Sequence, residues 1–83
     1  MIKSTVLVID DEPDIRELLA LTLSRMGLFC DTAHDFKQGI ECLKQNDYSL
    51  VLTDMRLPDG DGIDIVKYIQ QHKPQLLILF QPL

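Results

Sequence analysis

The sequence predicts a single α/β domain, an open doubly wound sheet of parallel strands with helices on its faces. Short β-branched and aliphatic runs alternate with longer stretches in which apolar residues recur at helical spacing. Runs that are apolar throughout are typical of strands covered on both faces of a parallel sheet. Because 83 residues leave no room for a second domain, residues 1–83 are interpreted as one unit.

The first strand and helix are predicted from the amino-terminal third of the chain. Thr5 to Ile9 is a continuous run of β-branched residues and Leu, which indicates a buried strand. Pro13 suits the first turn of a helix, with Asp11 or Glu12 as its cap. Apolar residues then recur at helical spacing until Gly27, which ends the helix.

The rest of the chain repeats this alternation and gives the order β-α-β-α-β-α-β. The second helix is opened by Asp35 with Gln38 three residues later, and its inner face is Phe36, Ile40 and Leu43. The third helix turns Ile65, Val66 and Ile69 inward. The expected segments are strands at 28–34, 48–53 and 76–80, a loop from Leu57 to Gly62, and a helix from Ile63 to about His72.

Charge and hydropathy exclude several classes of function. Thirteen acidic against eight basic residues give a net charge of −5, so nucleic acid is a poor direct partner. A membrane-spanning helix needs about 20 apolar residues, which this sequence lacks, and the amino terminus has no signal-peptide pattern. Cys30 and Cys42 have neither the number nor the spacing of a disulfide framework or a zinc site. We therefore expect a soluble cytoplasmic protein with two reduced thiols and no membrane contact.

Aspartates follow two of the predicted strands. Asp10 and Asp11 come directly after the first strand, and Asp54 comes directly after the third. In a flavodoxin-like sheet strand one lies between strands two and three, and ligands bind beyond the carboxyl ends of strands one and three. Carboxylates this close repel one another unless a cation lies among them, and Mg²⁺ prefers oxygen ligands. Singly each aspartate also suits a cap or a turn, but jointly they predict a Mg²⁺ site.

Two segments resemble the signature of a known family. Val-Leu-Val-Ile-Asp-Asp-Glu-Pro at 6–13 and Leu-Thr-Asp-Met-Arg-Leu-Pro-Asp-Gly-Asp-Gly at 52–62 are similar to the two signature segments of the receiver (CheY-like) domain of bacterial two-component response regulators. The resemblance covers essentially the whole chain. Met-Arg-Leu-Pro at 55–58 and Val-Lys-Tyr-Ile at 66–69 are most similar to receivers of NtrC-type sigma-54-dependent transcription activators, such as those that govern type IV pili.

The resemblance implies a phosphoacceptor site. Asp54 falls where receivers carry the aspartate that accepts phosphate from a sensor histidine kinase. Asp10 and Asp11 fall on the acidic pair that holds Mg²⁺, Asp11 directly and Asp10 through water. Arg56 falls on the position whose backbone carbonyl is a further ligand of the metal. The implied protein is a signalling module rather than an enzyme, and it controls transcription through an output domain outside this chain.

The sequence departs from the family pattern after its fourth strand. A complete receiver continues with a fourth helix, a fifth strand and a fifth helix, so the sheet is expected to be incomplete at its carboxyl-terminal end. The Ser or Thr that the family places after strand four falls near Pro82, where the chain has no hydroxyl, and the Lys after strand five is absent. We expect slow phosphorylation and an unpaired apolar edge at Leu76 to Phe80 that favours a homo-oligomer.

Two alternatives remain beside the phosphoacceptor hypothesis. A Mg²⁺-dependent phosphohydrolase would also use an aspartate after a first strand. Its Asp-x-Asp spacing is not matched by Asp10-Asp11-Glu12, and Asp54 would then be unexplained. A non-phosphorylatable interaction fragment would keep the fold and associate through the fourth strand.

Overall fold

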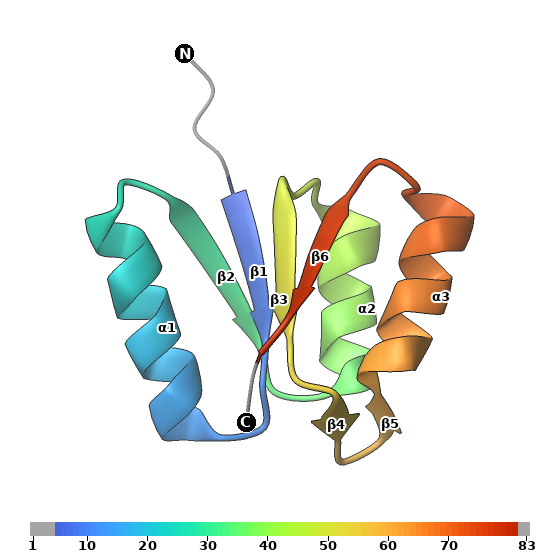
Figure 1. Cartoon of the computed structure of the whole chain (residues 1–83), viewed down its shortest axis with the longest axis horizontal. Helices are drawn as coiled ribbons and strands as arrows, with labels where there is room; N and C mark the ends of the chain where they lie inside the picture. The colour runs from blue at the N-terminus through green and yellow to red at the C-terminus, as the bar shows by residue number, and fades with distance from the viewer. Residues whose placement is uncertain (1–4, 82–83) are drawn as a thin grey trace.

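A computed structural model describes residues 5–81 as a parallel sheet with helices on both faces (Figure 1). In chain order the elements are β1 (Thr5–Ile9), α1 (Pro13–Arg25), β2 (Phe29–Ala33), α2 (Phe36–Gln45), β3 (Leu50–Thr53), β4 (Arg56–Leu57), β5 (Gly60–Asp61), α3 (Gly62–His72) and β6 (Leu77–Phe80). The four-stranded sheet has the order β2-β1-β3-β6, and all of its pairs are parallel. The predicted doubly wound fold, with β1 between β2 and β3, is confirmed.

The prediction of a loop from Leu57 to Gly62 is wrong. Arg56 pairs with Asp61 and Leu57 pairs with Gly60, so β4 and β5 form a minimal antiparallel hairpin, and Gly62 already begins α3. Strands of two residues are too short to show an alternating pattern in the sequence. The buried side chain of Leu57 joins the core and fixes the hairpin to the domain. The other predicted ends lie within two residues of the observed ones, and both ends of β1 agree with the prediction.

At the ends of α1 and α2 the predicted residues are in place, but one predicted side-chain cap is absent. Pro13 occupies the first turn of α1, but the preceding Glu12 makes no side-chain capping hydrogen bond. Gly27 ends the helix in the left-handed conformation with φ of 84°, which glycine adopts without strain. The Asp35 carboxylate accepts the Gln38 amide at 2.8 Å, as predicted for α2. Within residues 5–81, no helix has both the length and the apolar character needed to cross a membrane.

The core lies between the sheet and the pair α2 and α3. Leu43 and Ile65 are fully buried there, Ile69 nearly so, and Phe36 and Ile40 pack against them, as the helical spacing predicts. Their side chains meet those of the central strands β1 and β3. The cluster of buried apolar residues consists of Leu7, Ile9, Ala33, Leu43, Val51, Leu57, Ile65 and Ile69. This face holds the carboxyl ends of β1 and β3 in fixed positions.

On the opposite face of the sheet, α1 lies apart from α2 and α3 (Figure 1). No residue of α1 is buried, and Ile15 and Leu18 are 42% and 61% exposed. At the sheet edge formed by β6, Leu77 and Leu79 are 61% and 49% exposed. A cavity of about 710 Å³ lies between α1 and β6, and residues of α1, β3 and β6 line it. The unpaired apolar edge predicted at Leu76 to Phe80 is therefore present among the described residues.

Candidate functional site

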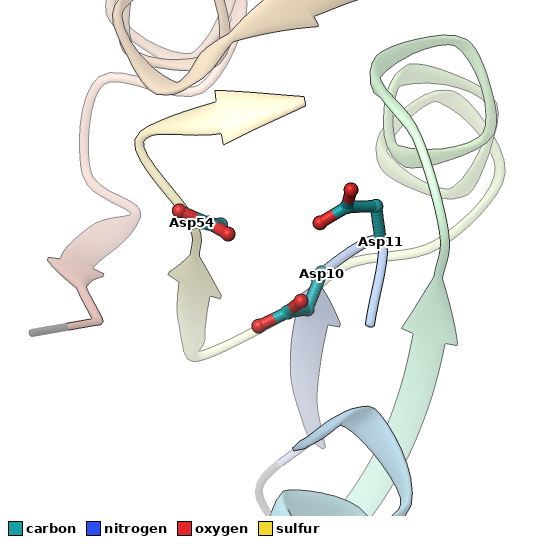
Figure 2. Close-up of side chains that lie close together, drawn as sticks. All are labelled: Asp10, Asp11 and Asp54. Atoms are coloured by element: carbon teal, nitrogen blue, oxygen red, sulfur yellow. The ribbon is translucent and has the colours of Figure 1, made fainter. Parts of the chain in front are cut away.

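Three carboxylates gather at one edge of the sheet. Each of Asp10, Asp11 and Asp54 offers an oxygen, and these oxygens lie within 4.8 Å of one another. Figure 2 shows the three side chains around one space beyond the ends of β1 and β3. The sequence prediction that these residues meet is confirmed, and their chemical roles remain predictions.

The pairing of β1 with β3 explains this meeting. Ile9 lies opposite Thr53 at the end of the ladder, so the next residue of each strand leaves the sheet at the same level. The Asp54 amide donates to the Ile9 carbonyl at 2.9 Å, and the Asp10 amide donates to the Ala33 carbonyl at 3.0 Å. Both aspartate backbones are thus still held by the sheet, which fixes where their side chains begin.

Asp10 is the buried member of the group, with 3% of its surface exposed. Its Oδ1 accepts the Glu12 amide at 2.8 Å, which closes a tight turn after β1. Its backbone carbonyl accepts a hydrogen bond from Nη1 of Arg16 at 2.8 Å. A buried carboxylate is tolerated only when hydrogen bonds or charges compensate it. The sequence analysis missed Arg16, because an arginine in the second turn of a helix carries no distinctive pattern.

Asp54 is half-buried, and a backbone amide donates a hydrogen bond to its carboxylate. Its Oδ1 accepts the Arg56 amide at 3.2 Å, while its carbonyl accepts the Thr53 hydroxyl at 3.0 Å. The Arg56 backbone therefore lies next to the acidic group, where the family resemblance expects it, and the role of its carbonyl stays a prediction. The Arg56 side chain is exposed and is not needed for this contact.

The donor set fits a hard divalent cation. All three side chains supply carboxylate oxygens, the ligand type that Mg²⁺ prefers. Two oxygens bound to one Mg²⁺ lie at most about 4.2 Å apart, since each bond measures about 2.1 Å. Oxygens that lie within 4.8 Å come close to this span, and a carboxylate bound through water would bridge the difference. The spacing is therefore compatible with carboxylates that bind one ion directly or through water.

The other residues considered in the sequence analysis, Pro82, Cys30 and Cys42, lie away from the three aspartates or outside the described range. Pro82, near which the family places its hydroxyl, lies outside residues 5–81. Cys30 and Cys42 are free and half-buried. Burial raises the pKa of both thiols, so they stay protonated near neutral pH. Neither thiol contributes to the acidic site.

Gly62 lies against the backbone that carries Asp54, and Gly62→Ala is expected to disturb the site. A Cβ at this position would lie 3.0 Å from the Asp54 carbonyl oxygen and 2.6 Å from Cε1 of Phe80. The Gly62 amide also donates to the Met55 carbonyl at 2.9 Å. We expect a loss of about 1–3 kcal/mol in urea unfolding and displaced amide signals at residues 54 and 55.

The matched control for this prediction is Gly27→Ala. A Cβ at Gly27 meets no atom within 4 Å, but its φ of +84° makes alanine unfavourable there. This variant should lower stability while it leaves the amide signals of residues 54 and 55 in place. Unmoved signals in Gly62→Ala would contradict the close approach.

Known proteins share this sequence and this arrangement. The response regulator receiver domain matches residues 6–81. The response regulator protein PilR of Pseudomonas aeruginosa is 53% identical over 75 residues, which cover 90% of this chain and 17% of PilR. The chain therefore spans less than a fifth of this relative, and the comparison concerns its receiver region only.

Solved receivers have the same fold. The response regulator TrrA of Thermotoga maritima, solved in complex with Mg²⁺-BeF, has a TM-score of 0.88 at 32% identity and is matched over 93% of this chain and 67% of its own. The beryllofluoride-activated receiver domain dimer of NtrC4 has a TM-score of 0.85 at 29% identity, over 92% of this chain and 63% of its own. The family match, the PilR relative and the solved folds all point to the same family as the acidic residues at the edge of the sheet. The chain belongs to the receiver domain family of response regulators.

Proposed function

We propose that this PilR-like receiver is a phosphoacceptor, in which Asp54 takes a phosphoryl group from a sensor histidine kinase. The observation that carries the proposal is the meeting of Asp10, Asp11 and Asp54 within 4.8 Å at the ends of β1 and β3. Asp54 is the member that follows β3, and its Oδ1 is already oriented by the Arg56 amide. Its half-buried position leaves it open to a donor.

The proposed reaction is a transfer between two side chains. A carboxylate oxygen of Asp54 attacks the phosphorus, and the bond from phosphorus to the kinase histidine nitrogen breaks. The electron pair of that bond returns to the nitrogen, and an acyl phosphate remains on Asp54. The chain itself contributes positioning and hydrogen bonds, and it is not an enzyme in this proposal.

Asp10, Asp11, Asp54 and the Arg56 carbonyl would hold Mg²⁺ beside the reacting oxygen. When bound, the ion neutralises the charge that the carboxylates and the phosphoryl oxygens bring together. The carboxylate donor set and the TrrA structure with Mg²⁺-BeF support this assignment. The Asp10 carboxylate is held by the Glu12 amide, so it can act as a fixed second-sphere acceptor for a metal-bound water.

The output of this module would be transcription control through another part of the protein. The name of one relative supports this, the transcriptional regulatory protein SrrA of Staphylococcus aureus, which is 32% identical over 74 residues. The chain itself would not contact nucleic acid, because its net charge is −5. We place the module in the cytoplasm, where its free Cys30 and Cys42 would stay reduced.

Magnesium titration tests the site directly. Millimolar Mg²⁺ is expected to shift the amide signals of Asp10, Asp11, Asp54 and Arg56 in the folded protein, because these residues surround the ion. Asp11→Asn removes one charged ligand and should abolish the response, whereas Asp14→Asn changes the same charge on the exposed first turn of α1 and should leave it intact. Signals that stay in place in the folded wild-type chain would contradict the metal site.

A second proposal concerns assembly, and one observation favours it. β6 lies at the edge of the sheet with large exposed apolar side chains, beside the cavity next to α1. We propose that the 83-residue chain forms a homo-oligomer through this edge. The beryllofluoride-activated NtrC4 receiver domain was solved as a dimer, so a protein of this fold can self-associate.

A further inference from the structure

Asp59 joins the β4–β5 hairpin to the amino-terminal end of α2. One of its carboxylate oxygens accepts the Phe36 amide at 2.7 Å, and the other accepts the Lys37 amide at 3.0 Å. The first amides of a helix have no partner within the helix, and a carboxylate is the acceptor that suits them best. The acceptor here comes from 22 to 23 residues away in the chain. It therefore links two separate elements rather than capping its own helix.

A second contact joins the same two parts of the molecule. A Cβ placed on Gly60 would lie 3.2 Å from both Cβ and Cγ of Phe36, so the hairpin tip packs tightly against the first residue of α2. The tip thus makes both a polar and an apolar contact with one helix end. Because hydrogen bonds and apolar packing join the hairpin tip to the same helix end, we interpret the hairpin as docked on α2.

The other end of the hairpin reaches the acidic site. The Arg56 amide, in β4, donates to Oδ1 of Asp54 at 3.2 Å. At the end of β5, Asp61 caps α3, and its carboxylate accepts the Asp64 amide at 3.1 Å. The hairpin is therefore held at α2 by Asp59, at α3 by Asp61 and at the phosphoacceptor by Arg56. If the hairpin tip moved away from α2, the movement would reach the Asp54 carboxylate through only three residues, Arg56, Leu57 and Pro58.

We propose that Asp59 is a positioning residue, which keeps the Arg56 backbone in place beside Asp54 by tying the hairpin to α2. This inference rests on the proposed metal and phosphoacceptor site for its functional consequence. Desolvation alone would raise the pKa of the Asp59 carboxyl, but hydrogen bonds from backbone amides, those of Lys37 and Phe36 first, outweigh it. The pKa therefore lies below its ordinary value, so the carboxylate stays ionised and the link persists at neutral pH.

Asp35 provides a matched control within the same helix end. Its carboxylate accepts the Gln38 amide at 2.8 Å and also lies 3.3 Å from Nε2 of His34, but it belongs to the turn before α2 and not to the hairpin. Asp59→Ala and Asp35→Ala each remove one carboxylate from the amino-terminal end of α2. Only Asp59→Ala also removes the hydrogen bonds between the hairpin and α2.

The experiment compares amide hydrogen exchange with Mg²⁺ affinity in the whole chain. Asp59→Ala should speed exchange of the Arg56 amide by about 10-fold and weaken Mg²⁺ binding by about 10-fold, as is usual when a group that orients a ligand is lost. Asp35→Ala should leave both within about twofold. Asp59→Asn keeps one acceptor oxygen and should lie between Asp59→Ala and the wild type. It also serves as the test variant if Asp59→Ala does not fold.

The two readouts separate this inference from the proposed function. If the wild-type chain does not bind Mg²⁺, the proposed metal site is refuted. The hydrogen exchange rate of the Arg56 amide still decides whether Asp59 holds the hairpin. If both Asp59 variants exchange at Arg56 as slowly as Asp35→Ala does, the positioning role of Asp59 is refuted. If exchange rises and Mg²⁺ affinity does not fall, the link exists and its role at the metal site is refuted.

Discussion

Incubated with Mg²⁺ and acetyl phosphate, the 83-residue chain is expected to take up one phosphoryl group at Asp54, slowly and incompletely. Among the described residues, the hydrogen bond recorded to the Asp54 carboxylate comes from the Arg56 amide. The Thr53 hydroxyl is directed to the Asp54 carbonyl, and the Lys73 ammonium binds Asp47 and the Asn46 carbonyl instead. Within residues 5–81, no side chain donates a hydrogen bond to the Asp54 carboxylate, so none is already positioned to compensate added charge there.

The size of the effect follows from the cost of losing such donors. One donor aimed at developing charge is worth about 2.7–4 kcal/mol, or roughly 100- to 1,000-fold in rate. The family resemblance calls for a hydroxyl and an ammonium, and the 83 residues supply neither at the expected positions. We therefore expect labelling that remains partial after incubation times that saturate a receiver carrying both groups.

Mass spectrometry of the intact chain measures this labelling. Asp54→Asn should remove it altogether, whereas Asp14→Asn, an exposed acid of α1, should leave it unchanged. Rapid stoichiometric labelling would show that the missing donors are unimportant here. Labelling that survives Asp54→Asn would identify another acceptor. A chain that binds Mg²⁺ but takes no phosphoryl group would favour the interaction-fragment hypothesis.

Most of the fold could be predicted because its signals are local. The β1 run from Thr5 to Ile9 is apolar at nearly every position, and the structure covers it on both faces as that pattern indicates. Helix α1 begins at Pro13, which suits a first helical turn, and α2 begins after Asp35, whose side chain caps it. Both signals are carried by residues at the helix start itself. The β4–β5 hairpin was not predictable, because two-residue strands have no period and depend on the burial of Leu57.

The acidic site was predictable for a different reason. Asp10 and Asp54 each follow a strand directly, and the topology alone brings the ends of β1 and β3 together. The residues that hold these aspartates were not predictable. Arg16 contacts a carbonyl six positions earlier, and Asp59 contacts amides more than twenty positions earlier. Such contacts depend on how the helices and strands pack together, and they leave no pattern in the local spacing of residues along the sequence.

Self-association through β6 is the consequence of two features that lie side by side. Within residues 5–81, β6 pairs with β3 on one side and with no strand on the other, so its outer backbone groups remain available. Leu77 and Leu79 are exposed on this strand, and the cavity between α1 and β6 is lined by Ile15, Leu18 and Leu19 of the helix. Soluble monomers protect such edges with charge, proline or a covering element. A second copy would bring both a strand for the edge and apolar side chains for the cavity.

The chain is therefore expected to be a dimer or larger at high micromolar concentration, joined through residues 75–83, of which 82 and 83 lie outside the described range. A two-fold axis would let the two β6 strands pair with each other and use the same surface on both copies. Leu77→Lys combined with Leu79→Lys should weaken the association, because it places charges on an edge that must lose water.

Light scattering of the purified chain decides the question. Leu21→Lys combined with Met26→Lys is the matched control, since it adds the same two charges at exposed apolar positions that do not line the cavity. This control should keep the oligomeric mass, while the β6 variant approaches the monomer mass. A folded wild-type chain that remains monomeric at high micromolar concentration would contradict the proposal, and equal masses for the two variants would move the interface away from β6. Among residues 5–81, the β6 edge combines backbone groups that pair with no further strand and an apolar cavity at the same place.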